Sequence, residues 1–138
     1  NLAKKASVSI LDLGIVCQSQ LDQVTTLSGG NQQKVMIGRW LSEKSEILLL
    51  DEPFQGVDIK ARRDIGSQIR QSSRERATLV FVSELDEAVE IADKIVVLHE
   101  GSYAGIFENK ESNIVDILSL YSGKSAGDVA MKSGTLNG

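Results

Sequence analysis

Hydrophobic residues along the chain occur in two patterns, a helical spacing of three and four residues and short apolar runs. The changes between these patterns divide the chain into helices and strands. Apolar residues three and four positions apart predict amphipathic helices, and the expected helices are residues 2–14, 29–42, 59–73, 84–92 and 110–121. Short segments rich in Ile, Leu, Val and Phe predict strands, and the expected strands are residues 47–50, 77–83, 94–98 and 103–108. The last two strands flank a turn at residues 99–102 and are expected to pair antiparallel.

Two of the predicted strands, 47–50 and 77–83, are rich in apolar residues and do not alternate with polar ones. Such a run is typical of a parallel strand that helices cover on both faces. We therefore expect two fully buried strands in a mostly parallel sheet, which makes the fold α/β. The helix 29–42 carries more apolar residues than one narrow stripe needs, and Trp40 is expected to fill the core.

Composition narrows the class of protein. The chain has 138 residues, 41% of them hydrophobic, and a net charge of −4. This length is typical of one domain, able to bury about two thirds of the surface of its unfolded chain. The acidic balance offers no basic face and argues against a nucleic-acid partner. No apolar run approaches the ~20 residues of a membrane span, and a single cysteine, Cys17, allows no internal disulfide.

The start of the helix 29–42 has the chemistry of a phosphate site. Ser28 is a good N-cap whose hydroxyl is expected to accept a backbone amide of the following turn. Gly29 and Gly30 remove side chains from the first turn, so an anion can approach the exposed N–H groups. A helix N-terminus also carries roughly half a positive charge, which favours phosphate.

Paired carboxylates follow the strand 47–50. Asp51 and Glu52 are expected to emerge at its carboxyl end, where open α/β sheets place their ligands. Two adjacent carboxylates there suit the binding of Mg²⁺ and the orientation of an attacking water. Pro53 ends the strand, and Asp58 is expected to cap the helix 59–73.

These motifs, in this order, resemble those of the ATP-binding-cassette (ABC) ATPases. Residues 27–30 (Leu-Ser-Gly-Gly) resemble their signature motif, residues 47–52 their Walker B strand, and residues 56–58 (Gly-Val-Asp) their D-loop. The sequence Ser-Gly-Gly-Asn-Gln-Gln-Lys-Val, with Gly-Val-Asp after Asp-Glu-Pro, is similar to the corresponding sequences of the double-cassette ATPases of ribose-, galactose- and xylose-type importers. The resemblance covers about residues 1–121 and is highly specific.

The resemblance implies a partial P-loop NTPase-type (RecA-like) core with the remnant of a helical subdomain. It places the end of that subdomain and a linker at 1–27, the carboxyl-terminal part of the core at 28–121, and a flexible tail at 122–138. The cofactors it implies are ATP and Mg²⁺. It also implies roles for single residues: Asp51 holds Mg²⁺ through water, Glu52 is the catalytic base, Asp58 communicates across the interface with the other cassette, and Ser28, Gly29, Gly30 and Asn31 bind the γ-phosphate of ATP held by that cassette.

Two departures from the family pattern bear on activity. Ser83 stands where most ABC ATPases have a histidine that holds the γ-phosphate, and a serine cannot be a cation; this suggests the second, less catalytic cassette. No G-x-x-x-x-G-K-[ST] loop occurs, because Leu118 occupies the glycine position that Gly123-Lys124-Ser125 would need. The chain is therefore expected to be the carboxyl-terminal part of a cassette and inactive alone, with weak or absent ATP binding.

The implied partners are the other cassette, the membrane-spanning permease subunits and, through them, a periplasmic or extracellular sugar-binding protein. The implied location is the cytoplasmic face of the cell membrane. The alternative function is a degenerate, non-catalytic cassette kept for assembly or regulation, with Ser83 as its mark and Glu52 as the argument against it. A soluble ABC ATPase of DNA repair or translation fits the signature wording less well.

The missing phosphate loop also removes a strand. In the topology that the chain resembles, the strand before that loop lies between the strands 77–83 and 94–98. Both strands would then present unpaired N–H and C=O groups, which are costly when buried and adhesive when exposed. Direct pairing of the two strands is one solution, but we expect the isolated chain to self-associate.

Overall fold

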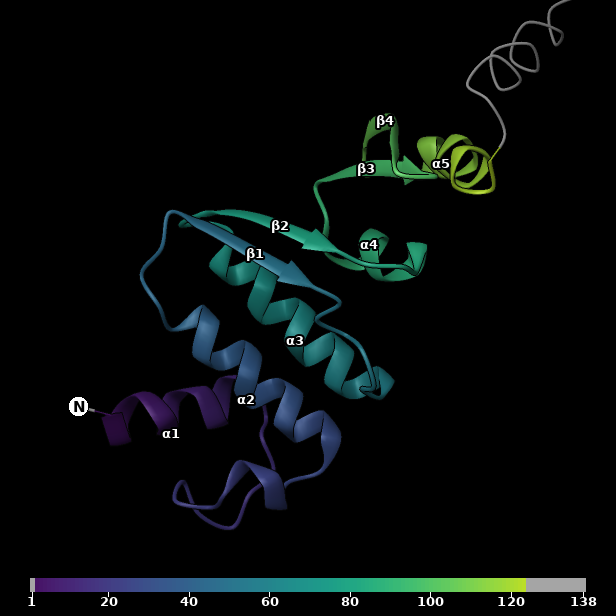
Figure 1. Cartoon of the computed structure of the whole chain (residues 1–138). Coiled ribbons are helices and arrows are strands. Elements are labelled where there is room, and N and C mark those ends of the chain that lie inside the picture. The colour runs from purple at the N-terminus through teal and green to yellow at the C-terminus, as the bar shows by residue number, and fades with distance from the viewer. Residues whose placement is uncertain (1, 124–138) are drawn as a thin grey trace, which may run out of the picture. The chain divides into compact units, whose positions relative to one another are not determined.

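The computed structural model describes residues 2–123, and the chain divides into two compact units that meet between Ile91 and Ala92 (Figure 1). The length predicted one domain, whereas the packing of the chain divides at this point. The reason is that strand pairing is local: the described strands form two sheets of two strands each, one sheet in each unit. The predicted tail lies almost wholly outside the described residues.

The first unit contains the predicted α/β elements in the predicted order. Its helices are α1 (Leu2–Asp12), α2 (Gly29–Leu41), α3 (Ile59–Ser72) and α4 (Leu85–Ile91), with a short 3₁₀ turn at Val24–Thr26. Its strands are β1 (Ile47–Asp51) and β2 (Ala77–Phe81). The two strands are parallel and in register, with Ile47 opposite Ala77 and Asp51 opposite Phe81. The α/β class and the parallel pairing are confirmed.

Among the described residues of the first unit, helices α2 and α3 cover one face of the β1–β2 sheet (Figure 1). The core of the first unit is a cluster drawn from α2, β1, α3, α4 and the turn after β1: Ile37, Leu48, Leu50, Phe54, Ile65, Ile69 and Ile91. Within β1 the burial alternates, because Leu50 is 5% exposed and its neighbour Leu49 is 64% exposed. Leu79 and Phe81 of β2 are exposed as well. The prediction of two fully buried strands is wrong, since α2 and α3 lie on the same side of the sheet (Figure 1).

Trp40 does not fill the core. It is 51% exposed, and the guanidinium of Arg39 lies 5.9 Å from the centre of its ring. The buried residues of α2 are Lys34, Ile37 and Gly38. This spacing of three and four defines a single inward stripe, and Trp40 falls outside it.

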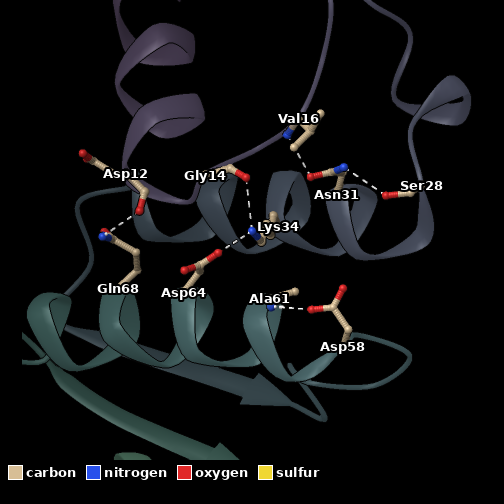
Figure 2. Close-up of polar contacts among 10 residues, drawn as sticks. All are labelled: Asp12, Gly14, Val16, Ser28, Asn31, Lys34, Asp58, Ala61, Asp64 and Gln68. Atoms are coloured by element: carbon tan, nitrogen blue, oxygen red, sulfur yellow. Dashed lines mark hydrogen bonds and ion pairs between the residues drawn. The ribbon is translucent and has the colours of Figure 1, made fainter.

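A buried ion pair joins the helices of the first unit. The Nζ of Lys34 in α2 lies 2.7 Å from Oδ2 of Asp64 in α3 and donates to the carbonyl of Gly14 at 3.2 Å (Figure 2). Gly14 has φ +57°, a conformation that glycine adopts without strain, and so turns the chain after α1. A single ammonium therefore holds the end of α1 against the α2–α3 pair.

The second unit is a hairpin packed on a helix. β3 (Lys94–His99) and β4 (Ser102–Glu108) pair antiparallel, as predicted, and a 3₁₀ turn at Glu111–Asn113 leads into α5 (Ile114–Tyr121). The hairpin turn has positive φ at Glu100 and Gly101, the signature of a two-residue primed turn. Among the described helices, none combines the length and the apolar character that crossing a membrane would need.

Candidate functional site

The carboxyl ends of β1 and β2 form the first half of the candidate site. Asp51 ends β1 opposite Phe81, and the amide of Glu52 donates to the carbonyl of Phe81 at 2.9 Å. Ser83 follows Phe81 by two residues. The parallel pairing therefore places Asp51, Glu52 and Ser83 at or just beyond the same, carboxyl end of the sheet.

Glu52 has an unusual backbone conformation. Its φ of +45° lies in the left-handed region, which non-glycine residues rarely adopt. Two hydrogen bonds hold it there: its amide donates to Phe81, and its carbonyl accepts from the amide of Gln55 at 3.1 Å. The following Pro53 is fully buried. The chain therefore turns sharply at Glu52, away from the direction of β1.

The carboxyl end of the β1–β2 sheet is negatively charged. The pKa of Glu87 in α4 is raised by its burial first and by the negative charge of Glu52 second. Negative charge at this edge favours a cation. No group of three or more His, Cys, Asp or Glu side chains in the described residues could hold a metal ion on its own. A cation bound here would thus complete its shell with oxygens of water or of a phosphate.

The second half of the site is the first turn of α2. Ser28 is the N-cap by backbone geometry, but its hydroxyl caps no backbone amide, so that part of the prediction is wrong. The hydroxyl instead accepts from Nδ2 of Asn31 at 2.9 Å, and Oδ1 of Asn31 accepts from the amide of Val16 at 2.9 Å (Figure 2). Gly29 has open space where a Cβ would lie. A ligand can therefore reach the backbone of this turn.

The N-terminus of α3 lies beside that of α2. A Cβ on Gly30 would sit 3.8 Å from Cβ of Ala61. Asp58 caps α3 as predicted, with Oδ1 accepting from the amide of Ala61 at 2.8 Å. A carboxylate therefore offsets the positive end of α3, whereas no side chain caps α2. Of the two adjacent ends, α2 keeps the greater capacity for an anion.

One contact between the halves was missed by the sequence reasoning. Nε2 of Gln33 in α2 donates to the carbonyl of Pro53 at 2.9 Å, directly after Glu52. A polar side chain four positions after Gly29, next to the inward stripe of α2, is the sequence signal that could have revealed it. Lys34 was missed for the same reason.

Comparison with known proteins places this geometry in a family. Residues 3–55 match the family model described as ABC transporter. A protein of Hahella chejuensis, provisionally named for ribose, galactose or methyl galactoside import, is 41% identical over 86% of this chain and 23% of its own length. The ribose import ATP-binding protein of Bacillus cereus is 39% identical over 80% of this chain and 23% of its own length. The arabinose import ATP-binding protein of Yersinia pestis is 38% identical over 86% of this chain and 23% of its own length.

Solved structures agree with this placement. A bacterial Atm1-family ABC exporter with ATP bound superposes with a TM-score of 0.70 at 25% identity, over 95% of this chain and 24% of that one. The ADP conformation of an ATP-binding cassette of an ABC transporter gives a TM-score of 0.62 at 22% identity, over 95% of this chain and 49% of that one. The fold is that of an ATP-binding cassette, with part of its P-loop NTPase core. The chain belongs to the ABC transporter family and spans about a quarter of the curated relatives it matches.

Proposed function

We propose that the chain is part of the ATP-hydrolysing subunit that energises monosaccharide import at the cytoplasmic face of a cell membrane. The observation that carries this proposal is the register of β1 and β2, which sets Asp51 opposite Phe81, two residues before Ser83, in the same unit as an α2 N-terminus that no N-cap side chain caps. The substrate class comes from the relatives, which are named for ribose, arabinose and related sugars.

The α2 turn suits a phosphate. An amide N–H such as that of Val16 can only donate, so it faces Oδ1 of Asn31, and the NH₂ group of Asn31 must face Ser28. The Ser28 oxygen therefore accepts, which leaves its own proton for an anion. The backbone amides of Gly29 and Gly30 lie in the first helical turn, where they have no intrahelical acceptor. In the proposal these donors hold the γ-phosphate of ATP bound by the other cassette.

The strand edge suits Mg²⁺ and a water. Carboxylate oxygens are the ligands that Mg²⁺ prefers, and Asp51 is solvent-exposed at the end of β1. Bound MgATP supplies the phosphoryl group and the positive charge that neutralises it. Glu52 orients the attacking water and accepts its proton, and Ser83 lies at the position where the family holds the γ-phosphate with histidine. Asp58 retains its capping bond while lying toward the other cassette.

A direct test is reconstitution of the full-length protein with its permease and sugar-binding subunits in vesicles. ATP-dependent accumulation of a labelled pentose or hexose is expected, with loss of transport and of MgATP hydrolysis when Asp51 and Glu52 are both replaced by the amides. Accumulation that persists without ATP would refute the proposal. The same preparation shows which partner subunits co-purify.

The isolated chain is predicted to bind MgATP negligibly, because Asp51 and Glu52 cannot hold a triphosphate without a phosphate loop. Titration calorimetry on the 138-residue chain tests this, and a micromolar dissociation constant would contradict it. The proposed partners contain no nucleic acid, in line with the net charge of −4.

A degenerate cassette that serves assembly is the second candidate, and Ser83 is the residue that favours it. We expect Glu52→Gln in the full-length protein to slow hydrolysis less than the matching substitution in the other cassette. Steady-state rates of the two variants decide between the candidates. No loss at all from Glu52→Gln would favour the degenerate cassette. A loss equal to or larger than that in the other cassette would contradict the assignment to the second position.

A further inference from the structure

Gln33 links the two halves of the site across a gap of 20 residues in sequence. It lies in the second turn of α2, and its Nε2 donates to the carbonyl oxygen of Pro53 at 2.9 Å in a partly buried setting. Its neighbour Gln32 makes a different contact: Nε2 of Gln32 donates at 2.8 Å to the carbonyl of Leu27, within the signature segment itself. Two adjacent glutamines therefore reach in different directions, one back along its own segment and one across to the strand end.

The Pro53 carbonyl is well placed to control Glu52. Proline has no amide hydrogen, so its carbonyl is the one backbone group through which Pro53 can accept or donate a hydrogen bond. Glu52 holds a left-handed backbone conformation, which persists in proteins only where the surroundings fix it. The bonds to Phe81 and Gln55 fix Glu52 itself. The bond from Gln33 fixes the residue that follows.

The direction of the Glu52 carboxylate depends on this turn. A change in the φ of Glu52 rotates its side chain about the backbone, so loosening of Pro53 would let the carboxylate leave the strand edge. We propose that Gln33 is a positioning residue for Glu52: its amide ties the catalytic turn to α2, the helix whose first turn holds phosphate. This inference rests on the proposed function. It adds that the phosphate turn and the catalytic base of one chain are mechanically connected.

The first test measures the tie itself, on the 138-residue chain without nucleotide. Gln33→Glu keeps the length of the side chain but replaces the donor with a carboxylate, which repels the Pro53 carbonyl. Amide hydrogen exchange at Gln55, whose N–H bonds to the carbonyl of Glu52, is expected to accelerate roughly three- to ten-fold, the worth of one hydrogen bond. Gln32→Glu, which breaks only the contact to Leu27, should leave exchange at Gln55 unchanged. Equal exchange in wild type and Gln33→Glu would overturn the inference.

The second test separates positioning from general stability in the full-length protein. In a full-length protein whose other cassette carries the matching glutamine substitution, so that the remaining turnover reports this cassette, Gln33→Glu is expected to lower kcat for MgATP roughly ten-fold and to change KM less than about two-fold, because a misplaced base affects the transition state alone. Gln71→Glu, an exposed change on α3, controls for the added charge. A loss of kcat that merely follows a loss of folded protein, judged by the melting curve, would overturn the positioning role.

The proposed function and the role of Gln33 can each be refuted separately. A wild-type protein that hydrolyses no MgATP overturns the proposed function, whatever Gln33→Glu does to exchange at Gln55. A wild-type protein that hydrolyses MgATP, together with a Gln33→Glu variant whose kcat is unchanged when the other cassette is inactivated, overturns only the inference about Gln33.

Discussion

The two faces of the β1–β2 sheet have similar composition and opposite environments. On the covered face Leu48 and Leu50 are buried against α2 and α3, and on the open face the large side chains of the same strands are exposed. The open-face residues are Ile47, Leu49, Leu79 and Phe81. An apolar strand thus indicates that a face needs covering, but it does not say which segment covers it.

The covered face also differs in the charges that it buries. Lys34 is buried in the helix layer, where its ammonium is held by Asp64 and Gly14. The open face consists mainly of aliphatic and aromatic side chains, with Asp51 at its carboxyl end. The helix layer is thus fixed by specific polar bonds, whereas the open face is adhesive without being specific.

The largest expected effect comes from two neighbouring leucines. Leu50→Ala removes a buried side chain and leaves a cavity, which is expected to cost about 2–5 kcal/mol of unfolding free energy. Leu49→Ala, one residue earlier, should cost less than about 1 kcal/mol, because that side chain is already solvated. Urea denaturation of the 138-residue chain measures both. Equal losses would show that the open face is covered in solution.

The buried ion pair predicts an asymmetric result. The Lys34 side chain is 6% exposed and that of Asp64 is 31% exposed. Asp64→Asn leaves the more deeply buried charge without its counter-ion and is expected to cost about 3 kcal/mol. Lys34→Met leaves a carboxylate that water can reach, and it should cost about half as much. The order of the two denaturation midpoints is the measurement, and the reverse order would refute this account.

The open face predicts self-association of the isolated chain. Each of the strands β2 and β3 has one partner strand among the described residues, so the edges as well as the open face are available. Leu49→Lys places a charge on that face and is expected to weaken association roughly ten-fold, or about 1.4 kcal/mol. Light scattering over a micromolar concentration series tests this. A wild-type chain that stays monomeric throughout would remove the basis for the prediction.

The smallest expected effect is a change in the pKa of Glu87, near the carboxyl end of the β1–β2 sheet. Because burial and the charge of Glu52 raise the pKa of Glu87, the folded state loses stability as pH rises through that pKa. Glu52→Gln should lower the pKa of Glu87 and leave the part of the shift that is due to burial. Glu84→Gln, which removes a weaker cause, should lower it less. NMR titration of the Glu87 side chain distinguishes the two, and a larger shift from Glu84→Gln would contradict the assigned geometry.

The sequence predicted elements and motifs better than it predicted environments. Helix and strand positions followed from local periodicity, and the register of β1 and β2 then set Asp51 opposite Phe81, two residues before Ser83. The exposure of Leu49 and Trp40 depends on which segments lie nearby, and periodicity within one element does not contain that information. Ser28 was misjudged because Asn31 competes for its hydroxyl, a choice that depends on the position of Val16. Gln33 was missed because its acceptor lies 20 residues away.

The in-register pairing of β1 with β2 has a consequence for folding accuracy. Leucines occupy three successive positions of β1, so a slip by one residue would exchange Leu49 and Leu50 at little hydrophobic cost. Polar groups at the strand ends break this near-degeneracy. Arg76, directly before β2, donates to the carbonyls of Leu41 and Glu43, and the amide of Glu52 bonds Phe81 at the far end. A slip would move Asp51 about 3.3 Å relative to Ser83. The apolar middle of β1 stabilises its pairing with β2, whereas the polar contacts at the strand ends fix the register. That register sets the position of Asp51 relative to Ser83.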